Sequence, residues 1–293
     1  MVTREDLEGL DHMLWHGNGP RAAVALRCNQ STVSRRVQRC LGTFGLRLRR
    51  RSGSWVIQGP SLLLQMEREI HQLARLLGEH PLRLEGFAVG SGHLLQPPPP
   101  GWAMGPHDAA GIWGPFGLLK ERIIDAWLTD AADDLPQNPE FPIVVWPLAQ
   151  QPITLIASAL HPLVGDANLQ ISDLARFPIP IVPEESFPRC HALSAQLGLG
   201  TFHTSVRRYE PQLWEGLTSN DLTLVYTTPL NARAHPDLVT LDALPLFTNR
   251  LALVCREDVA TYERVQDLHC LLKTRLQYIQ KSHPHLERLR LLP

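Results

Sequence analysis

The sequence of 293 residues has five cysteines, widely spaced and without a CxxC pair. An odd number in this arrangement argues against a disulfide framework and against a structural zinc site. No run of 18 apolar residues occurs, which excludes an ordinary membrane-spanning helix. The first residues also lack the apolar core of a secretory signal peptide. These absences predict a cytoplasmic protein with reduced thiols and no membrane partner.

Motifs for catalysis or cofactor binding are missing as well. Gly90-Ser91-Gly92 lacks the G-x-S-x-G spacing of a nucleophile elbow, and the glycines from Gly86 onward do not follow the dinucleotide-binding order. Neither a P-loop lysine nor an HExxH motif is present. Thirteen histidines occur, but the closest pairs, Cys190-His191 and His283-Pro-His285, are more typical of surface residues than of metal ligands. We therefore expect no enzyme activity, no cofactor and no metal, and an α/β enzyme is the least favoured class.

Lysine is absent from the first 80 residues, which carry twelve arginines against seven acidic residues, a net charge of +5. The remaining chain has 16 basic and 22 acidic residues, a net charge of −6. Nine of the arginines lie between Arg21 and Arg51, where no acidic residue occurs. Such a block is typical of a surface that binds a polyanion, most simply nucleic acid, although a solvated basic face is the plainer alternative.

Proline is scarce in the same region, since only two of the 25 prolines, Pro20 and Pro60, precede residue 80. The sequence Gly78-Glu-His-Pro81 has the glycine and proline that commonly end a helix. We place a domain boundary there. Helical patterns precede it, and short apolar strands alternate with helical stretches after it, which indicates an α/β region.

The periodicity of the first 44 residues predicts three short helices. Leu7, Leu10 and Leu14 mark the first helix, which Gly17-Asn-Gly19 should end, and a short second helix follows from Arg21 to Leu26. A third helix is expected at about 30–41, with Asn29 as its N-cap. One side of it is apolar, formed by Val33, Val37, Cys40, Leu41 and Phe44, and the other carries Thr32, Arg35, Arg36 and Arg39.

This arrangement is that of a helix-turn-helix whose last helix reads a DNA major groove. Arginine can donate two hydrogen bonds to a guanine, and amides or hydroxyls near the helix start can reach bases or phosphates. The residues expected to face the groove are Gln30, Ser31, Thr32, Ser34, Arg35, Arg36 and Arg39.

Four arginines, Arg47 and 49–51, then precede Ser52-Gly53-Ser54 and the apolar Trp55-Val56-Ile57. We interpret this segment as a β-hairpin, or wing, that presents Arg50, Arg51 and Ser54 to the phosphate backbone. The alternative is a hairpin whose arginines serve only solubility.

A long helix is predicted over 60–77, with Pro60 in its first turn. Its apolar residues recur at intervals of three and four, namely Leu63, Met66, Ile70, Leu73 and Leu77. The stripe could pack on its own domain, but its position favours dimerisation. A two-fold dimer would present two reading helices to a pseudo-palindromic site in double-stranded DNA.

The N-terminal residues resemble a known family. Ala22-Ala23 and Leu26, followed by Gln30-Ser31 and by Val33-Ser34-Arg35-Arg36-Val37, are similar to the helix-turn-helix of LysR-type transcriptional regulators. Gly45-Leu-Arg-Leu48 with Arg51 resembles the segment that follows in that family. The sequence departs from the family pattern at Leu41, Arg49, Gln58, Pro60 and Ser61.

The resemblance implies a regulatory domain of two α/β lobes, similar to periplasmic binding proteins. Several segments look like its strands and its final helix: 82–85, 123–128, 152–156, 221–229, 247–256 and 271–279. The family resemblance places polar contacts to the effector at strand ends, which correspond here to Ser91, Gly92, His93, Thr218 and Ser219. Ordinary loop capping would explain these residues equally well. The prolines 97–100 cannot lie inside the usual lobe-one helix, so that helix should be shortened or missing, which puts effector binding and tetramer assembly in doubt.

The predicted fold is therefore multidomain α+β. It consists of a winged helix-turn-helix DNA-binding domain (1–59), a linker and dimerisation helix (60–80) and a regulatory domain (81–293). Lobe one would comprise about 81–150 and 246–293, and lobe two about 151–245. The predicted function is that of a dimeric, sequence-specific DNA-binding transcription regulator. Whether a small-molecule effector in the regulatory domain controls it is left open. The alternative is a ligand-binding protein that keeps the N-terminal domain mainly for dimerisation.

Overall fold

The computed structural model describes residues 2–51, 54–88, 90–108, 111–204, 209–241, 244–283, 286 and 288–293. The chain forms two compact units. Unit 1 comprises Met1–Glu85, Pro100–Pro106 and Pro115–Trp127, and unit 2 comprises Gly86–Pro99, His107–Gly114 and Leu128–Pro293. Within the described ranges, no helix is both long and apolar enough to cross a membrane.

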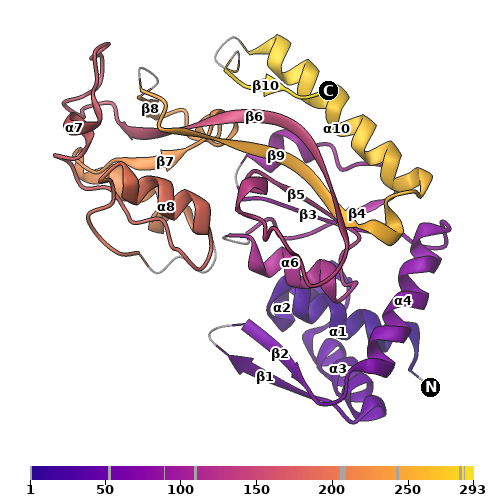
Figure 1. Ribbon diagram of the computed structural model, residues 1–293. Helices are drawn as coiled ribbons and strands as arrows, with labels where there is room; N and C mark the ends of the chain where they lie inside the picture. The colour runs from indigo at the N-terminus through magenta and orange to yellow at the C-terminus, as the bar shows by residue number, and fades with distance from the viewer. Residues whose placement is uncertain are drawn as a thin grey trace. The chain divides into compact units, whose positions relative to one another are not determined.

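Unit 1 begins with the three predicted helices, α1 (Arg4–His16), α2 (Gly19–Ala25) and α3 (Gln30–Phe44) (Figure 1). Local chemistry sets their ends. The Thr3 hydroxyl accepts a hydrogen bond from the Asp6 amide, and the Asn18 side chain accepts one from the Arg21 amide. Gly17 ends α1 with φ 73°, a left-handed conformation that favours glycine. The helices enclose a core that includes Leu7, Leu10, Ala22, Val33, Val37 and Cys40.

A two-stranded antiparallel hairpin follows, as the sequence predicts, formed by β1 (Arg47–Arg51) and β2 (Ser54–Gln58). Arg47 is opposite Gln58 and Arg51 is opposite Ser54. Leu48 and Ile57 pack against the helical core, which anchors the hairpin to the helices. Ser52, Gly53 and the Ser54 side chain, which the sequence analysis assigned to the wing, lie outside the part that the structure describes.

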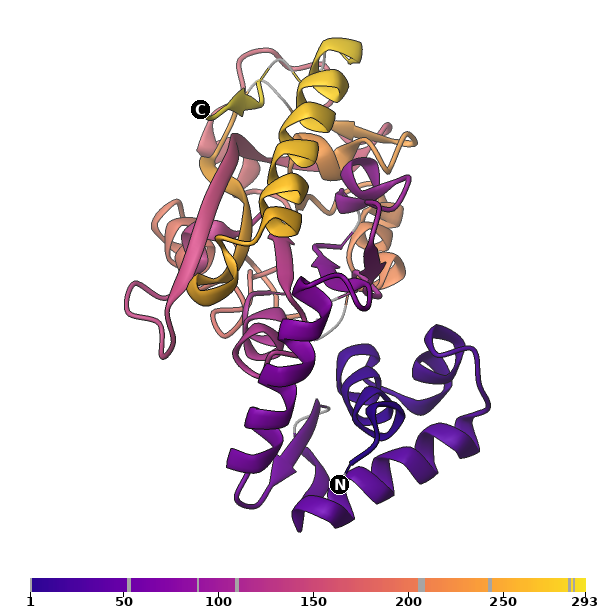
Figure 2. The same cartoon turned by 90° about the vertical axis from the view of Figure 1, so that its right-hand side faces the viewer.

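The long helix α4 spans Leu62–Leu76, with Ser61 as its N-cap, and follows the hairpin along the chain (Figure 2). The prediction of Pro60 in the first turn is wrong, because Pro60 precedes the N-cap and the helix begins two residues after it. The buried side chains of α4 are Leu64, Arg68, Gln72, Arg75 and Leu76. Three of these five are polar, so α4 packs against its own unit largely through a polar face.

Beyond α4, β3 (Leu82–Gly86) pairs in parallel with β4 (Trp102–Met104). In the described part of the segment between them, the helix is the five-residue α5 (Ser91–Leu95), which ends before Gln96 and the four prolines. The helix that was expected to be shortened or missing is thus present with five residues, and the prolines lie outside it. The elements after it are α6 (Trp113–Lys120), β5 (Ala126–Thr129) and the 3₁₀ turn η1 (Ala132–Asp134). The strand expected over 123–128 thus starts three residues later, at Ala126.

Unit 2 is built around two long antiparallel strands, β6 (Ile143–Ser158) and β9 (Phe247–Arg256). Near the end of β6, β7 (Val225–Thr227) and β8 (Leu238–Thr240) pair with it, and β10 (Arg290–Leu291) pairs with its middle. The predicted strands 152–156 and 247–256 are confirmed, and the 221–229 segment contains β7. Figure 1 shows β6 and β9 running alongside each other.

Short helices and turns, together with one helix of 20 residues, complete the described part of unit 2. They are α7 (Ile171–Leu174), α8 (Pro188–Gln196), η2 (Pro211–Leu213), η3 (Glu215–Asn220), α9 (Pro229–Ala232), η4 (Glu257–Val259) and α10 (Glu263–Ser282). The helix expected over 271–279 lies within α10, which begins eight residues earlier and ends three residues later. A core of apolar side chains from β6, β7, α7 and α8, including Leu155, Leu174, Cys190 and Tyr226, lies at the β7–β8 end of β6.

Candidate nucleic-acid interface

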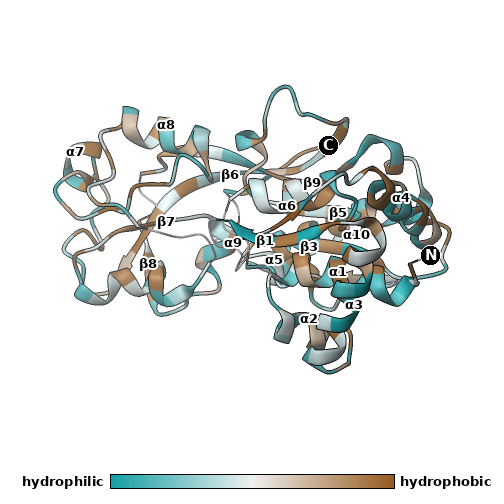
Figure 3. Ribbon diagram, turned by 90° about the horizontal axis from the view of Figure 1, so that it is seen from below, coloured by the Kyte–Doolittle hydropathy of each residue, from teal (hydrophilic) through white to brown (hydrophobic). Residues whose placement is uncertain are grey.

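The outer face of α3 is the strongest candidate surface for nucleic acid. Val33, Val37, Cys40 and Leu41 are buried on the opposite face, as the sequence predicts. Gln30, Ser31, Ser34 and Arg35 are exposed, and Thr32 and Arg36 are half-buried. Figure 3 shows strongly hydrophilic residues, in teal, on α3 and on β1. The helix thus separates an apolar core face from a polar outer face.

The position of α3 depends on a close approach to α1. A Cβ atom built at Gly9 would lie 2.6 Å from the Cβ atom of Arg36, closer than real side chains approach. Glycine on α1 therefore lets the two helices touch at Arg36. The aliphatic stem of Arg36 covers α1, which explains why this residue is only partly exposed. The neighbouring Arg35 is exposed, and its Nε donates to the Ser31 carbonyl oxygen at 3.3 Å.

Arg39, also predicted to face DNA, is engaged with α1. Its Nε and Nη2 donate to the Asp6 carboxylate at 3.1 and 2.6 Å. This hydrogen bond lowers the pKa of Asp6 and raises the pKa of Arg39. The Asp6 side chain is largely buried, whereas that of Arg39 remains 59% exposed. In the free protein Arg39 therefore has a carboxylate partner, which sets it apart from Arg35 on the same face.

The hairpin adds a second basic surface. Arg47, Arg49, Arg50 and Arg51 are exposed on β1. The Trp55 indole Nε1, on β2, donates to the Gly17 carbonyl oxygen at 3.0 Å and ties the hairpin to the turn between α1 and α2. The arginines of β1 are thus carried on a strand that is fixed to the helical core.

The apolar stripe of α4 is exposed. Its five predicted residues, Leu63, Met66, Ile70, Leu73 and Leu77, are between 44% and 68% exposed, and Leu62 is 66% exposed. Burying such side chains contributes about 1.5–3 kcal/mol each. The alternative that the stripe packs on its own domain is wrong for this chain, because the opposite, polar face of α4 does so.

That polar face belongs to a buried ion-pair cluster within unit 1 that the sequence reasoning missed. Asp11 on α1 accepts from Arg68 Nε at 2.9 Å and from Arg83 Nη1 at 3.0 Å. Arg75 forms a bidentate pair with Asp125, at 2.8 and 2.9 Å. Burial opposes the charge of Arg75, but Asp125 more than offsets this and raises the pKa of Arg75. The spacing of Arg68, Gln72 and Arg75 along one helix face was the available signal.

Two further contacts extend the cluster. Arg68 Nη1 donates to Glu121 at 2.7 Å, and the Trp15 indole donates to the buried Glu85 carboxylate at 2.5 Å. Helix α1, helix α4 and the β3–β4 pair are therefore joined inside unit 1 by charged side chains.

The predicted effector residues lie on two elements of unit 2. On α5, the buried Ser91 hydroxyl donates to the Phe87 carbonyl oxygen, and His93 is half-buried beside Gly92. Burial, with the charges of Arg233 and His283, lowers the pKa of His93. On η3, the Thr218 hydroxyl donates to the Glu215 carbonyl oxygen at 2.7 Å, and Ser219 is exposed. The hydroxyls of Ser91 and Thr218 thus have local backbone partners, as loop capping requires.

Metal ligation and the buried thiol of Cys190 were the competing site chemistries to consider in the described residues. No group of three or more His, Cys, Asp or Glu side chains there could hold a metal ion. Cys190 is buried in α8, where its Sγ lies 3.2 Å from Asp134 Oδ2. Burial first, and then the Asp134 charge, raise the pKa of the Cys190 thiol. A thiol with a raised pKa is a poor nucleophile.

No family model matches the sequence, and no curated protein matches it. Solved structures do. The chain is similar to CbnR, a LysR family transcriptional regulator, at 14% identity and a TM-score of 0.54, over 92% of this chain and 98% of that one. A complex of full-length CbnR with its target DNA gives 15% identity and a TM-score of 0.53, with the same coverage. A full-length OxyR point variant from Pseudomonas aeruginosa gives 15% identity and a TM-score of 0.52, over 94% and 95%. The chain has the fold of the LysR-type transcriptional regulators.

Proposed function

We propose that the protein is a sequence-specific, DNA-binding transcription regulator that acts as a dimer. The observation that supports this most directly is the two-sided α3 helix. Its apolar side is buried in the three-helix core, and its polar side presents Gln30, Ser31, Ser34 and Arg35 to solvent. A helix with hydroxyl, amide and guanidinium groups on its outer face can lie in a major groove and form hydrogen bonds with the edges of the bases.

In this proposal the residues divide into two roles. Gln30, Ser31, Thr32, Ser34, Arg35 and Arg36 face the groove, while Arg50, Arg51 and Ser54 on the hairpin contact phosphates. Arg39 contacts DNA only after exchanging Asp6 for a phosphate, since both are anionic partners for the same guanidinium. The fold-level likeness to a regulator solved with its target DNA supports this assignment.

The dimer would form through the exposed stripe of α4. Six neighbouring apolar side chains on one helix face form an unusually apolar surface for a monomer. The polar face of the same helix is already occupied by the ion-pair cluster, so the apolar face is the one available to a second copy. A two-fold pair would present two α3 helices to the two halves of a pseudo-palindromic site.

The long antiparallel pair of β6 and β9 supports a regulatory region of two α/β lobes. A small-molecule effector remains an open part of the proposal. The shortened α5 is the element in which this chain departs from the expected lobe-one helix. Ser91, Gly92, His93, Thr218 and Ser219 remain the proposed effector contacts.

Footprinting on the DNA upstream of the protein's own reading frame, at two salt concentrations, tests the proposal. A protected pseudo-palindrome that survives competitor DNA would support it. Salt-sensitive coating without protection there, followed by failure to select a preferred sequence from random DNA, would overturn sequence-specific regulation. A solution dimer with that result and a bound metabolite would indicate instead a ligand-binding protein that uses the N-terminal domain to dimerise.

A further inference from the structure

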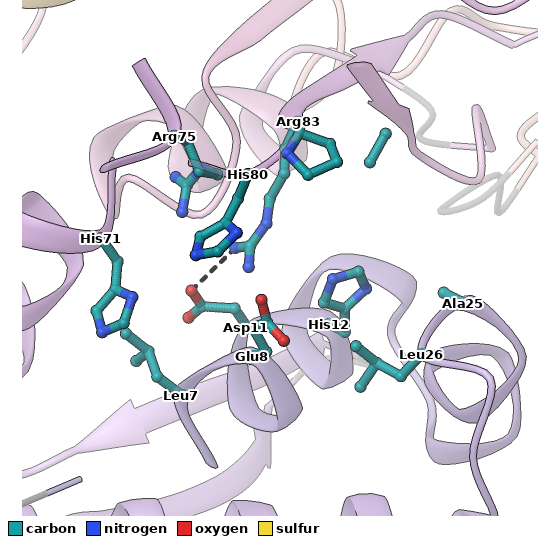
Figure 4. A pocket seen from close by; sticks show the side chains of 12 residues that line it. Leu7, Glu8, Asp11, His12, Ala25, Leu26, His71, Arg75, His80 and Arg83 are labelled. Atoms are coloured by element: carbon teal, nitrogen blue, oxygen red, sulfur yellow. Dashed lines mark hydrogen bonds and ion pairs between the residues drawn. The ribbon is translucent and has the colours of Figure 1, made fainter. Parts of the chain in front are cut away.

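Unit 1 contains a hollow of about 180 Å³ that the proposed function does not use. Its walls come from α1, the end of α2, the C-terminal half of α4, and β3 and β4 (Figure 4). An engineered cavity of about 150 Å³ admits benzene, so this space has room for a molecule of about six heavy atoms. It is separate from the proposed effector residues, which belong to unit 2.

The lining of this hollow divides into an apolar and a polar part. Apolar groups come from Leu7, Ala25, Leu26, Pro81 and Ala103. Imidazole and guanidinium groups come from His12, His71, His80, Arg75 and Arg83, and the carboxylates are those of Glu8 and Asp11. In Figure 4 the three imidazole rings, from α1, α4 and the segment before β3, surround the same space as the two guanidinium groups.

The carboxylates at the hollow are already neutralised. Asp11 is shared by Arg68 and Arg83, and Glu8 pairs with Arg4 at 2.9 Å. Arg75, which also lines the hollow, is paired with Asp125. Two groups at the hollow still have their pKa values lowered by a neighbouring guanidinium. Burial and then the charge of Arg83 lower the pKa of His12 to about 2, and burial followed by the charge of Arg75 lowers the pKa of Arg83. A bound anion would raise the pKa of His12 and the pKa of Arg83, because it would offset the neighbouring positive charge.

His12 also has an unmet hydrogen-bonding group. Its Nδ1 atom is buried and has no hydrogen-bond partner among the residues that the structure describes. A buried polar atom without a partner costs about 1–3 kcal/mol. In the tautomer that has its proton on Nδ1, His12 could donate it to a carboxylate oxygen.

We propose that this hollow binds a small organic anion, a monocarboxylate with a short apolar body, whose carboxylate lies beside His12 and Arg83 and whose body lies against Leu26 and Ala103. Such a ligand would touch the helix-turn-helix segment, α4 and the β3–β4 pair at once. It would therefore bind at a second site, distinct from the strand-end residues proposed for the effector.

Butanoate, with six heavy atoms, is a suitable probe, and butanamide is its neutral isostere. The full-length protein is labelled with ¹³C at its alanine methyl groups, and the signals of Ala25 and Ala103 are followed during titration. We expect saturable shifts of both signals with butanoate and affinity at least about tenfold weaker for butanamide. Equal affinity for the two compounds, or no shift at either methyl, would overturn the proposal.

A blocking variant provides the second arm. Ala103→Leu places extra carbons in the hollow without changing any charge, and Ala192→Leu, on the exposed face of α8, is the matched control. With Ala25 as the remaining reporter, Ala103→Leu should weaken butanoate binding at least about tenfold, and Ala192→Leu should leave it unchanged. Undiminished butanoate binding to a folded Ala103→Leu protein would place the anion elsewhere and refute the site.

Discussion

Arg68 on α4 and Asp11 on α1 form a fully buried ion pair, with 2.9 Å between Nε and Oδ1. The pair joins the first helix of the helix-turn-helix segment to the helix proposed for dimerisation. A second oxygen of the same carboxylate accepts from Arg83 on β3. Three elements of unit 1 therefore meet at the Asp11 carboxylate. Loss of this carboxylate would leave the guanidinium groups of Arg68 and Arg83 with less compensating negative charge.

We predict that Asp11→Asn lowers the free energy of unfolding by about 3–5 kcal/mol, because removing one partner leaves buried charge uncompensated. Urea unfolding followed by circular dichroism measures the change. Glu8→Gln, which removes an exposed ion pair from the same helix, is the control and should cost less than about 1 kcal/mol. Equal effects of the two substitutions would show that the buried pair contributes nothing particular to stability.

The sequence was sufficient for the three helices, the hairpin and the long helix because each carries local signals. Gly17 and Gly45 end α1 and α3 in left-handed conformations, and Leu48 and Ile57 alternate with arginines or exposed residues across the hairpin. Turn chemistry and periodicity act over a few residues, so one sequence is enough to recognise them.

The ion-pair cluster could not be derived in the same way. Asp11, Arg68 and Asp125 are far apart in the sequence, and each alone is typical of a solvated surface residue. Only the tertiary arrangement shows that Arg68, Gln72 and Arg75 form the buried face of α4 while its leucines stay exposed. For the same reason the partner of Arg39 was not foreseen: Asp6 lies 33 residues earlier in the chain.

Arg35 should read a base. We predict that Arg35→Ala weakens binding to the selected DNA site by about 1–3 kcal/mol and relaxes base preference at one position. Arg36→Ala should act in the same direction. Arg50→Ala, on the hairpin, should instead weaken binding to specific and random DNA alike. Fluorescence anisotropy with both DNAs separates these cases, and an equal loss on the two for Arg35→Ala would reassign that residue to a phosphate.

Asp6 should compete with DNA for Arg39. Replacing it by Asn removes the carboxylate, so Arg39 becomes available to a phosphate. We expect Asp6→Asn to tighten DNA binding. The number of counterions released on binding, measured by how steeply the binding constant falls with salt concentration, should rise by about one. Asp173→Asn, in unit 2, is the control for loss of one negative charge. Unchanged affinity and salt dependence in Asp6→Asn would argue that Arg39 does not reach the DNA.

The exposed stripe of α4 should control assembly. We predict that Ile70→Glu shifts the protein toward monomer, because a charge at the centre of the proposed interface replaces a side chain worth about 1.5–3 kcal/mol when buried. Gln65→Glu adds the same charge to α4 at an exposed position outside the stripe and should have no effect. Sedimentation equilibrium measures the association constant. An Ile70→Glu protein that associates as strongly as the wild type would rule out this face as the interface.

His12 should make the protein sensitive to mild acid. Its pKa is lowered to about 2 by burial and by the charges of Arg83, His16 and Arg75, whereas an unfolded histidine titrates near its ordinary value of 6.5. The unfolded chain therefore binds the proton first, and stability falls as the pH drops below about 6.5. The cost reaches about 2 kcal/mol at pH 5. His12→Gln removes this titration, so its free energy of unfolding should change less between pH 7 and pH 5 than that of the wild type. Parallel pH dependence in the two proteins, measured by urea unfolding, would show that His12 is protonated as readily in the folded state as in the unfolded one.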